Sequence, residues 1–225
     1  MNEHAAAYGQ ARQRFAALVA ELEPETLARK VPACPDWSIK DLTSHVVGIA
    51  RDLNRSNVDD PGGEAWTAAQ IAEGATKSIP ELLTEWEGFS IEIEKAMEFM
   101  HPAISGVTVA DLIVHEHDLR GALDRPGARD SSGVSLALFT YTRMLGRRLK
   151  SDGAPPLRII TGGQTYDLGE GAPDTTLSGN AFEIFRSLCG RRTKREIAGL
   201  QWEGDPAPYL DRFSNYGYPD SSLNE

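Results

Sequence analysis

The chain has 225 residues, enough for one large domain or two small ones, and its 40% apolar and 25% charged residues are typical of a soluble globular protein. A net charge of −10 argues against the basic surface that binds a nucleic-acid backbone, so we expect no nucleic-acid partner. Two cysteines, Cys34 and Cys189, are too few for a structural zinc finger or a disulfide framework.

Helical periodicity dominates the first 150 residues. Apolar residues at helical spacing predict helices over residues 3–23, 39–55, 64–75 and 79–100, with the linker KVPACPDWS before the second helix and a loop at 57–63. Ser38 and Asp41 have the spacing of a capping box, which predicts the start of the second helix. Thr108 and Asp111 have the same spacing, which predicts that the next helix opens there and ends before Pro126 and Gly127. A fifth helix is predicted over 132–149.

The pattern changes near residue 152. LRIITGG and QTYDLG, rich in β-branched and aromatic residues, predict a hairpin, and DTTLSG predicts a third strand. Asn180 and Gly190 bracket a predicted helix, AFEIFRSLCG; EIAGLQW is a predicted strand and DPAPYLDRF a last short helix. We therefore expect a helical bundle over residues 1–150 and a small α+β domain over 151–225.

Neither a signal peptide nor a membrane span is expected. The stretch MNEHAAAYGQARQRF lacks an apolar core, and no run of about 18 apolar residues occurs. We expect a protein of the reducing cytoplasm that is not in a membrane.

A stripe of polar residues follows one face of the helix around residue 115. Asp111, His115 and Asp118 are spaced i, i+4, i+7, and aliphatic residues flank them. An inward-facing stripe needs a partner, because an unpaired buried charge is costly. His45, on the apolar face of the second helix, is a candidate. One histidine from one helix and Asp-x-x-x-His from another offer three ligands and leave a fourth position open, which is typical of catalytic zinc.

Each of these residues also has a structural interpretation. His45 fits a satisfied core histidine, and Asp111 fits a helix cap that binds only backbone amides. Asp118 fits a second-layer acceptor for a ligand N–H, a structural group or a fourth ligand. For the remaining residues of these types we favour structural or surface roles: His4, Cys34, His101, His117 and Cys189.

Three segments carry a resemblance to a known family. CPDWSIKDLTSHVVGIA and DLIVHEHDLRGAL resemble motifs of the mycothiol-dependent maleylpyruvate isomerase family, within the DinB-like four-helix superfamily, and the tail from TLSGNAFEIF resembles its small carboxy-terminal domain. The resemblance implies a DinB-like four-helix bundle that holds a divalent metal, usually zinc, through His45, Asp111 and His115. The family more often has Glu where Asp111 stands, and Trp where His117 stands.

The resemblance also implies a chemistry. Such proteins use a low-molecular-weight thiol, here mycothiol, and a thiol at the open position of zinc becomes a nucleophilic thiolate. Attack on an activated double bond would isomerise a small electrophile, and attack on a carbon with a leaving group would be S-transfer. The alternative is a non-catalytic metal-binding or regulatory protein of the same fold.

A basic cluster, GRRTKR, stands out in the second domain. Its structural interpretation is a solvated run of charges near a helix end. Its functional interpretation makes Arg191 or Arg192 the group that pairs with a carboxylate of an anionic substrate.

Overall fold

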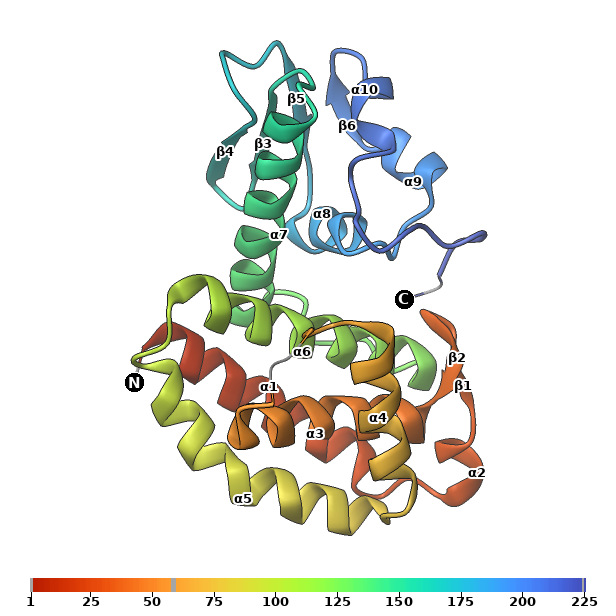
Figure 1. The fold of residues 1–225 in the computed structure, drawn as a ribbon. Helices are drawn as coiled ribbons and strands as arrows, with labels where there is room; N and C mark the ends of the chain where they lie inside the picture. The colour runs from red at the N-terminus through yellow and green to blue at the C-terminus, as the bar shows by residue number, and fades with distance from the viewer. Residues whose placement is uncertain (1, 58–59, 224) are drawn as a thin grey trace. The chain divides into compact units, whose positions relative to one another are not determined.

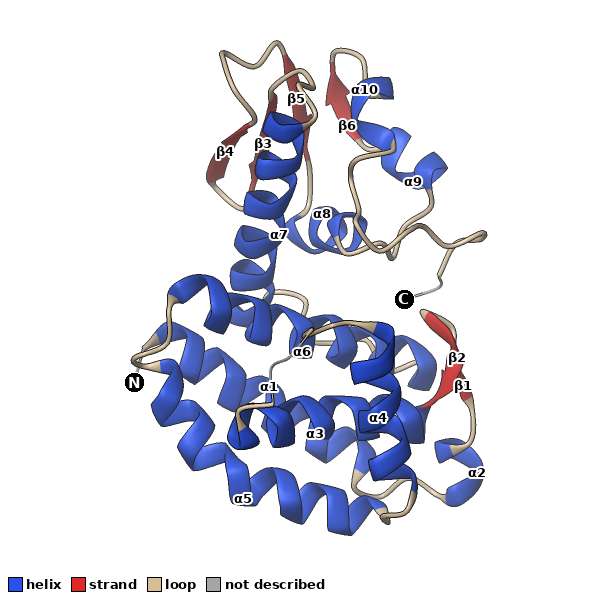
Figure 2. Ribbon diagram, in the orientation of Figure 1, coloured by secondary structure: helices blue, strands red, loops and turns tan. Residues whose placement is uncertain are grey.

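The structure, a computed structural model, describes residues 2–57, 60–223 and 225. The chain divides into two compact units, one up to Gly127 together with Glu225 and one from Ala128 onward (Figure 1). The first unit is helical apart from one small hairpin, whereas the second combines helices with a four-stranded sheet (Figure 2). The predicted class, a helical bundle followed by a small α+β part, is confirmed. Within the described ranges, no helix is long and apolar enough to cross a membrane.

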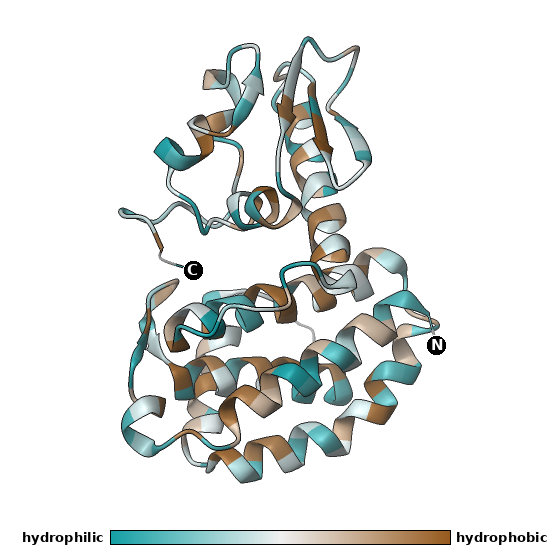
Figure 3. Cartoon of the chain, turned by 180° about the vertical axis from the view of Figure 1, so that it is seen from behind, coloured by the Kyte–Doolittle hydropathy of each residue, from teal (hydrophilic) through white to brown (hydrophobic). Residues whose placement is uncertain are grey.

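Four long helices form the first unit. Helix α1 packs on α5 and α6, and α3 packs on the same two, so that the four close around a shared core. Their bounds are α1 Glu3–Val19, α3 Ile39–Arg55, α5 Ile79–Met97 and α6 Pro102–Leu123. Apolar and polar residues alternate along these helices (Figure 3), as expected for helices with a buried face. Phe15, Leu42, Trp86 and Ile113, one from each helix, are at most 1% exposed, and burial of each side chain contributes about 1.5–3 kcal/mol.

Three smaller features complete this unit. Helix α4 (Glu64–Ala75) packs along α3, and α2 is the single turn Pro24–Leu27. The segment predicted as a linker forms an antiparallel hairpin instead, β1 (Lys30–Val31) and β2 (Cys34–Ser38), because Val31 is fully buried against the bundle. The predicted bounds of α3 and α4 are confirmed. Part of the predicted loop at 57–63, residues 58 and 59, lies outside the described residues.

Helix α6 starts earlier than the sequence indicated. It begins at Pro102, with the side chain of His101 accepting from the backbone N–H of Ala103, so the predicted start at Thr108 was wrong. Thr108 lies inside the helix and donates its hydroxyl to the Ile104 carbonyl. Pro at the first helical position is a start signal because its missing N–H has no role there.

Burial on all sides explains why α6 mixes charged and aliphatic residues. Residues 112–119 are all buried, so its charged groups need protein partners. Glu116, fully buried, accepts from the guanidinium groups of Arg14 and Arg120 at 2.7–3.0 Å. Two carboxylate oxygens shared by two guanidinium groups satisfy this charge.

The second unit is built around a sheet with the strand order β4-β3-β5-β6. Strands β3 and β4 form the predicted hairpin, β3 and β5 are parallel, and β5 and β6 are antiparallel. Its elements are α7 (Ser132–Ser151), β3 (Leu157–Thr161), β4 (Gln164–Leu168), β5 (Thr175–Ser178), α8 (Ala181–Leu188), α9 (Lys194–Ala198), β6 (Gln201–Glu203) and α10 (Ala207–Leu210).

Two details differ from the sequence-based expectation. The segment EIAGLQW is a strand only in its last part, because the capping box of Thr193 and Glu196 starts a helical turn ahead of it. Helix α7 packs on β4 and α8, so contacts group it with the sheet and put the division of the chain near residue 127 rather than 150.

Candidate metal centre

Three predicted ligands converge inside the first unit. His45 lies on α3, and Asp111 and His115 lie one turn apart on α6. One ligand atom from each residue lies within 4.8 Å of the other two. Nε2 of His115 is 3.7 Å from Asp111 Oδ1, and the two imidazole rings are perpendicular with centroids 5.1 Å apart. Bonds of about 2.0–2.2 Å from a cation to nitrogen and oxygen fit donors at this separation.

Asp111 is not a helix cap. Because α6 begins at Pro102, Asp111 lies in its third turn, where backbone amides are already bonded along the helix. Its Oδ2 atom is buried, and no hydrogen-bond donor reaches it among the described residues. An unsatisfied carboxylate oxygen is costly to bury, and a bound cation would satisfy it. The donors present therefore fit a divalent metal.

Both imidazoles are oriented by a partner on the other nitrogen. Nδ1 of His45 lies 2.8 Å from Gln70 Oε1, and Gln70 in turn donates to Asp52 Oδ2 at 2.6 Å. Nδ1 of His115 lies 3.0 Å from Asp118 Oδ2. Each Nδ1–H is thus donated, so that each Nε2 is the nitrogen left to bind a metal. Asp118 occupies the position expected of a second-layer acceptor, and its role stays a prediction.

Gln70 was missed by sequence reasoning, although a signal was present. A Cβ at Gly48 of α3 would lie 2.5 Å from the Cβ of Gln70, and a Cβ at Gly74 of α4 would lie 2.3 Å from the Cβ of Ser44. One glycine on each helix therefore permits a close approach of α3 and α4. This approach places Gln70 beside His45 on the preceding turn.

The two histidines have opposite electrostatic environments. Burial lowers the pKa of His45 to about 4, so its imidazole is neutral at pH 7. Burial also disfavours a charge on His115, but the Asp111 carboxylate and hydrogen bonds with Asp118 and Cys34 outweigh it and raise the pKa of His115 to about 10. Without metal, a protonated His115 thus offsets part of the negative charge of the carboxylates on either side.

The hairpin covers this centre. The ring centroid of Trp37 lies 4.9 Å from that of His45 and 5.9 Å from that of His115. Cys34, half-buried on the same strand, donates its thiol to Asp118 Oδ2 at 3.6 Å. An aromatic wall of this kind restricts water on one side of the donors.

The other histidines have varied surroundings. His101 is exposed, as expected, whereas His4 is partly buried with Nδ1 2.6 Å from the hydroxyl of Ser105. His117 is buried at 3% exposure, which agrees with a packing role.

The two predicted arginines lie in the second unit. Arg192 is buried and donates to both carboxylate oxygens of Glu183 at 2.8 and 3.1 Å, and Arg191 donates to the carbonyl of Cys189 at 2.8 Å. These contacts give both guanidinium groups a structural role within the unit. Their predicted role toward a substrate carboxylate stays a prediction.

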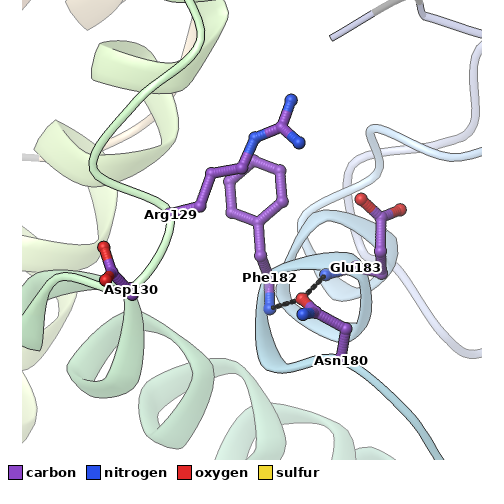
Figure 4. A pocket seen from close by; sticks show the side chains of 5 residues that line it. All are labelled: Arg129, Asp130, Asn180, Phe182 and Glu183. Carbon is purple, nitrogen blue, oxygen red and sulfur yellow. Dashed lines mark hydrogen bonds between the residues drawn. The ribbon is translucent and has the colours of Figure 1, made fainter.

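A pocket of about 430 Å³ also lies in the second unit (Figure 4). The guanidinium of Arg129 is 4.9 Å from the ring centroid of Phe182, and Asn180 caps α8 by accepting from two backbone amides. Glu183, on its rim, is held by Arg192. The pocket includes none of the three candidate ligands.

A sequence model described as "Mycothiol maleylpyruvate isomerase N-terminal domain" matches residues 8–120, half of the chain and all three candidate ligands. The chain belongs to this family. The prediction of the mycothiol maleylpyruvate isomerase family, and of an enzyme family, is thereby confirmed. Two uncharacterized proteins of Mycobacterium tuberculosis, from strains CDC 1551 and H37Rv, are 26% identical over 154 residues, which cover 66% of this chain and 83% of each relative.

Two crystal structures share the fold. They are of the mycothiol-dependent maleylpyruvate isomerase and of a mutant of it, with TM-scores of 0.52 and 0.56 and identities of 15% and 13%. Each alignment covers 84% of this chain and 88% of the solved chain. At this identity the likeness concerns the fold alone, which supports the two-part architecture.

Proposed function

We propose that the protein is a metal-dependent, mycothiol-using isomerase of a small electrophile with an activated double bond, of the kind that maleylpyruvate represents. The observation that carries the proposal is the convergence of His45, Asp111 and His115. Three protein ligands are typical of catalytic zinc sites, whereas structural zinc sites have four. Family membership supplies the thiol: the family is named for mycothiol.

The chain's own residues have separable tasks in this proposal. His45 and His115 would hold a divalent ion through Nε2, and Asp111 would hold it through a carboxylate oxygen. Such an ion, most suitably zinc, would lower the pKa of a bound thiol, so that thiolate would exist at neutral pH. Gln70 and Asp118 keep the two imidazoles in place by accepting their Nδ1–H groups.

In this proposal the nucleophile is an external thiol and not a cysteine of the protein. The chain has two cysteines, Cys34 and Cys189. Cys34 donates a hydrogen bond to Asp118, and Cys189 is buried in the second unit. A thiolate that adds to one carbon of a cis double bond turns that bond into a single bond. Rotation about it and departure of the same thiolate give the trans product, so the thiol is regenerated. Trp37 limits the access of competing water.

The test starts with protein purified without a chelating column. Elemental analysis should give one divalent ion per chain, calorimetry should detect thiol binding to the metal-loaded form, and maleylpyruvate with mycothiol should be isomerised. His115→Ala should lose both metal and turnover, because two ligands rarely hold zinc. Metal and thiol binding without turnover of any such electrophile would favour the non-catalytic alternative, and turnover without thiol would refute the proposal.

A further inference from the structure

A second set of donors meets at the opposite nitrogen of the His115 imidazole. Cys34, His115 and Asp118 each offer a ligand atom, and these atoms lie within 4.8 Å of one another. Nε2 of His115 faces Asp111, whereas Nδ1 faces Asp118 at 3.0 Å. The two donor sets therefore share one imidazole and use its two sides.

The distances between the ligand atoms of this second set suit a cation with tetrahedral coordination. Bonds of about 2.3 Å to sulfur and about 2.0–2.2 Å to nitrogen and oxygen put neighbouring ligands roughly 3.3–3.7 Å apart. The Cys34 Sγ–Asp118 Oδ2 distance, 3.6 Å, already lies in that range, and the 3.0 Å between Asp118 and Nδ1 must widen by a few tenths of an ångström. His115 and Asp118 are 6% and 1% exposed, whereas Cys34 is half-buried.

The donor types select the cation. A thiolate with an imidazole and a carboxylate favours thiophilic divalent ions, cadmium or zinc, over magnesium or calcium. We propose that Cys34, Nδ1 of His115 and Asp118 form a second cation site of this kind, adjacent to the first. Binding releases two protons to solvent, the thiol proton of Cys34 and the Nδ1 proton of His115. Oδ2 of Asp118, which accepts a hydrogen bond from each of these groups without the ion, then binds the ion instead. When both sites are filled, His115 bridges them as imidazolate.

The proposal does not depend on catalysis. For zinc we expect the second ion to bind at least about tenfold more weakly than the first, because two dications repel each other and share a ligand. Excess zinc would also remove the hydrogen bond that orients His115, and so disturb the first site.

Cadmium provides the test, because a thiolate ligand gives a charge-transfer absorption that imidazole and carboxylate do not. The whole chain, reduced with a phosphine in the absence of thiols, should take up two cadmium ions, with the absorption present at saturation. Cys34→Ser should lose the absorption and one ion while keeping the other. Cys189→Ser is the matched control, since these are the two cysteines of the chain, and should behave as wild type.

Two further variants separate the sites. His45→Ala should keep the thiolate absorption, because His45 belongs only to the first set. His115→Ala should lose both ions, with circular dichroism to check that it folds. Uptake of a single ion without the absorption would overturn the proposal. So would an absorption that His45→Ala abolishes, since the thiolate would then belong to one mixed centre. A catalytically silent protein that still binds two ions would refute only the proposed function.

Discussion

Asp111 is the candidate ligand that stands where the sequence resemblance more often implies Glu. Its carboxylate is one methylene shorter, yet Oδ1 already lies 3.7 Å from Nε2 of His115. Asp111 lies on the same helix as His115, one turn before it, and this placement brings the shorter side chain to that distance. The side chain is 34% exposed, which leaves room for one more methylene.

We therefore expect Asp111→Glu to keep the metal. Asp111→Asn, nearly identical in shape, removes the charge and should weaken zinc binding by about 100-fold, the upper end of the 10- to 100-fold typical of changes one layer further out. Competition with a chromophoric chelator measures both affinities. If Asn binds as well as Asp, the carboxylate is not a ligand.

At the level of elements, the close approach of α3 and α4 controls the orientation of His45. Gly48→Ala would place a methyl group 2.5 Å from the Cβ of Gln70, so α4 must shift. We expect a loss of about 1–3 kcal/mol in the free energy of unfolding, and up to about 100-fold weaker metal binding because Gln70 leaves His45. Gly88→Ala, on α5 with open space around it, is the control and should stabilise the protein by about 0.5–1 kcal/mol. Denaturation and metal titration of both variants check this, and unchanged affinity in Gly48→Ala would contradict it.

An ion-pair network joins α3 to α5. Arg51 of α3, 1% exposed, donates two hydrogen bonds to Glu85 of α5 at 2.8 and 2.9 Å, and Lys77 adds one at 2.7 Å. The hydrogen bonds from Arg51 are the main cause that lowers the pKa of Glu85 from 4.5 to about 2. Because the folded-state pKa is the lower one, this stabilisation is complete above pH 4.5 and is lost as the pH falls toward 2.

Glu85→Gln should therefore be less stable than wild type at pH 7 by on the order of 2–3 kcal/mol, with a difference that shrinks between pH 4.5 and 2. Chemical denaturation across this pH range gives the measurement. Glu92→Gln, which breaks an exposed pair with Lys95 on the same helix, serves as control and should stay near wild type. A constant difference down to pH 2 would mean that Glu85 is not the titrating group.

The sequence was sufficient where a local signal fixed the structure. Ser38 and Asp41 form the predicted capping box, and the helix they start carries His45. Asp111 and His115 needed only helical spacing to be paired. The start of α6 was misjudged because the Thr108–Asp111 spacing imitates a cap, and Pro102 was the true signal. Gln70 was missed because its contact depends on the packing of two helices: Gly48 and Gly74 permit that packing, but no local spacing tells which residue of α4 then faces His45.

At the scale of the whole molecule, the candidate metal centre belongs to one unit. Its three ligands, the two second-layer acceptors and the hairpin all precede Gly127. Arg129, exposed in the segment between α6 and α7, offers a site for trypsin. Brief digestion of the metal-loaded chain should release an amino-terminal fragment that keeps the ion, and mass spectrometry with elemental analysis would identify it. Metal found only in uncut chains would mean that the second unit is needed to hold it.

The tryptophan of the hairpin gives the protein a built-in optical signal. The chain has four tryptophans, and Trp37 is the one whose ring lies 4.9 and 5.9 Å from the two candidate ligand imidazoles. A paramagnetic ion such as cobalt(II), bound by these imidazoles, should quench the emission of Trp37. Titration followed by fluorescence, with Trp37→Phe as the silent reference, would then report the occupancy of the centre in real time, without a label and without knowledge of the substrate.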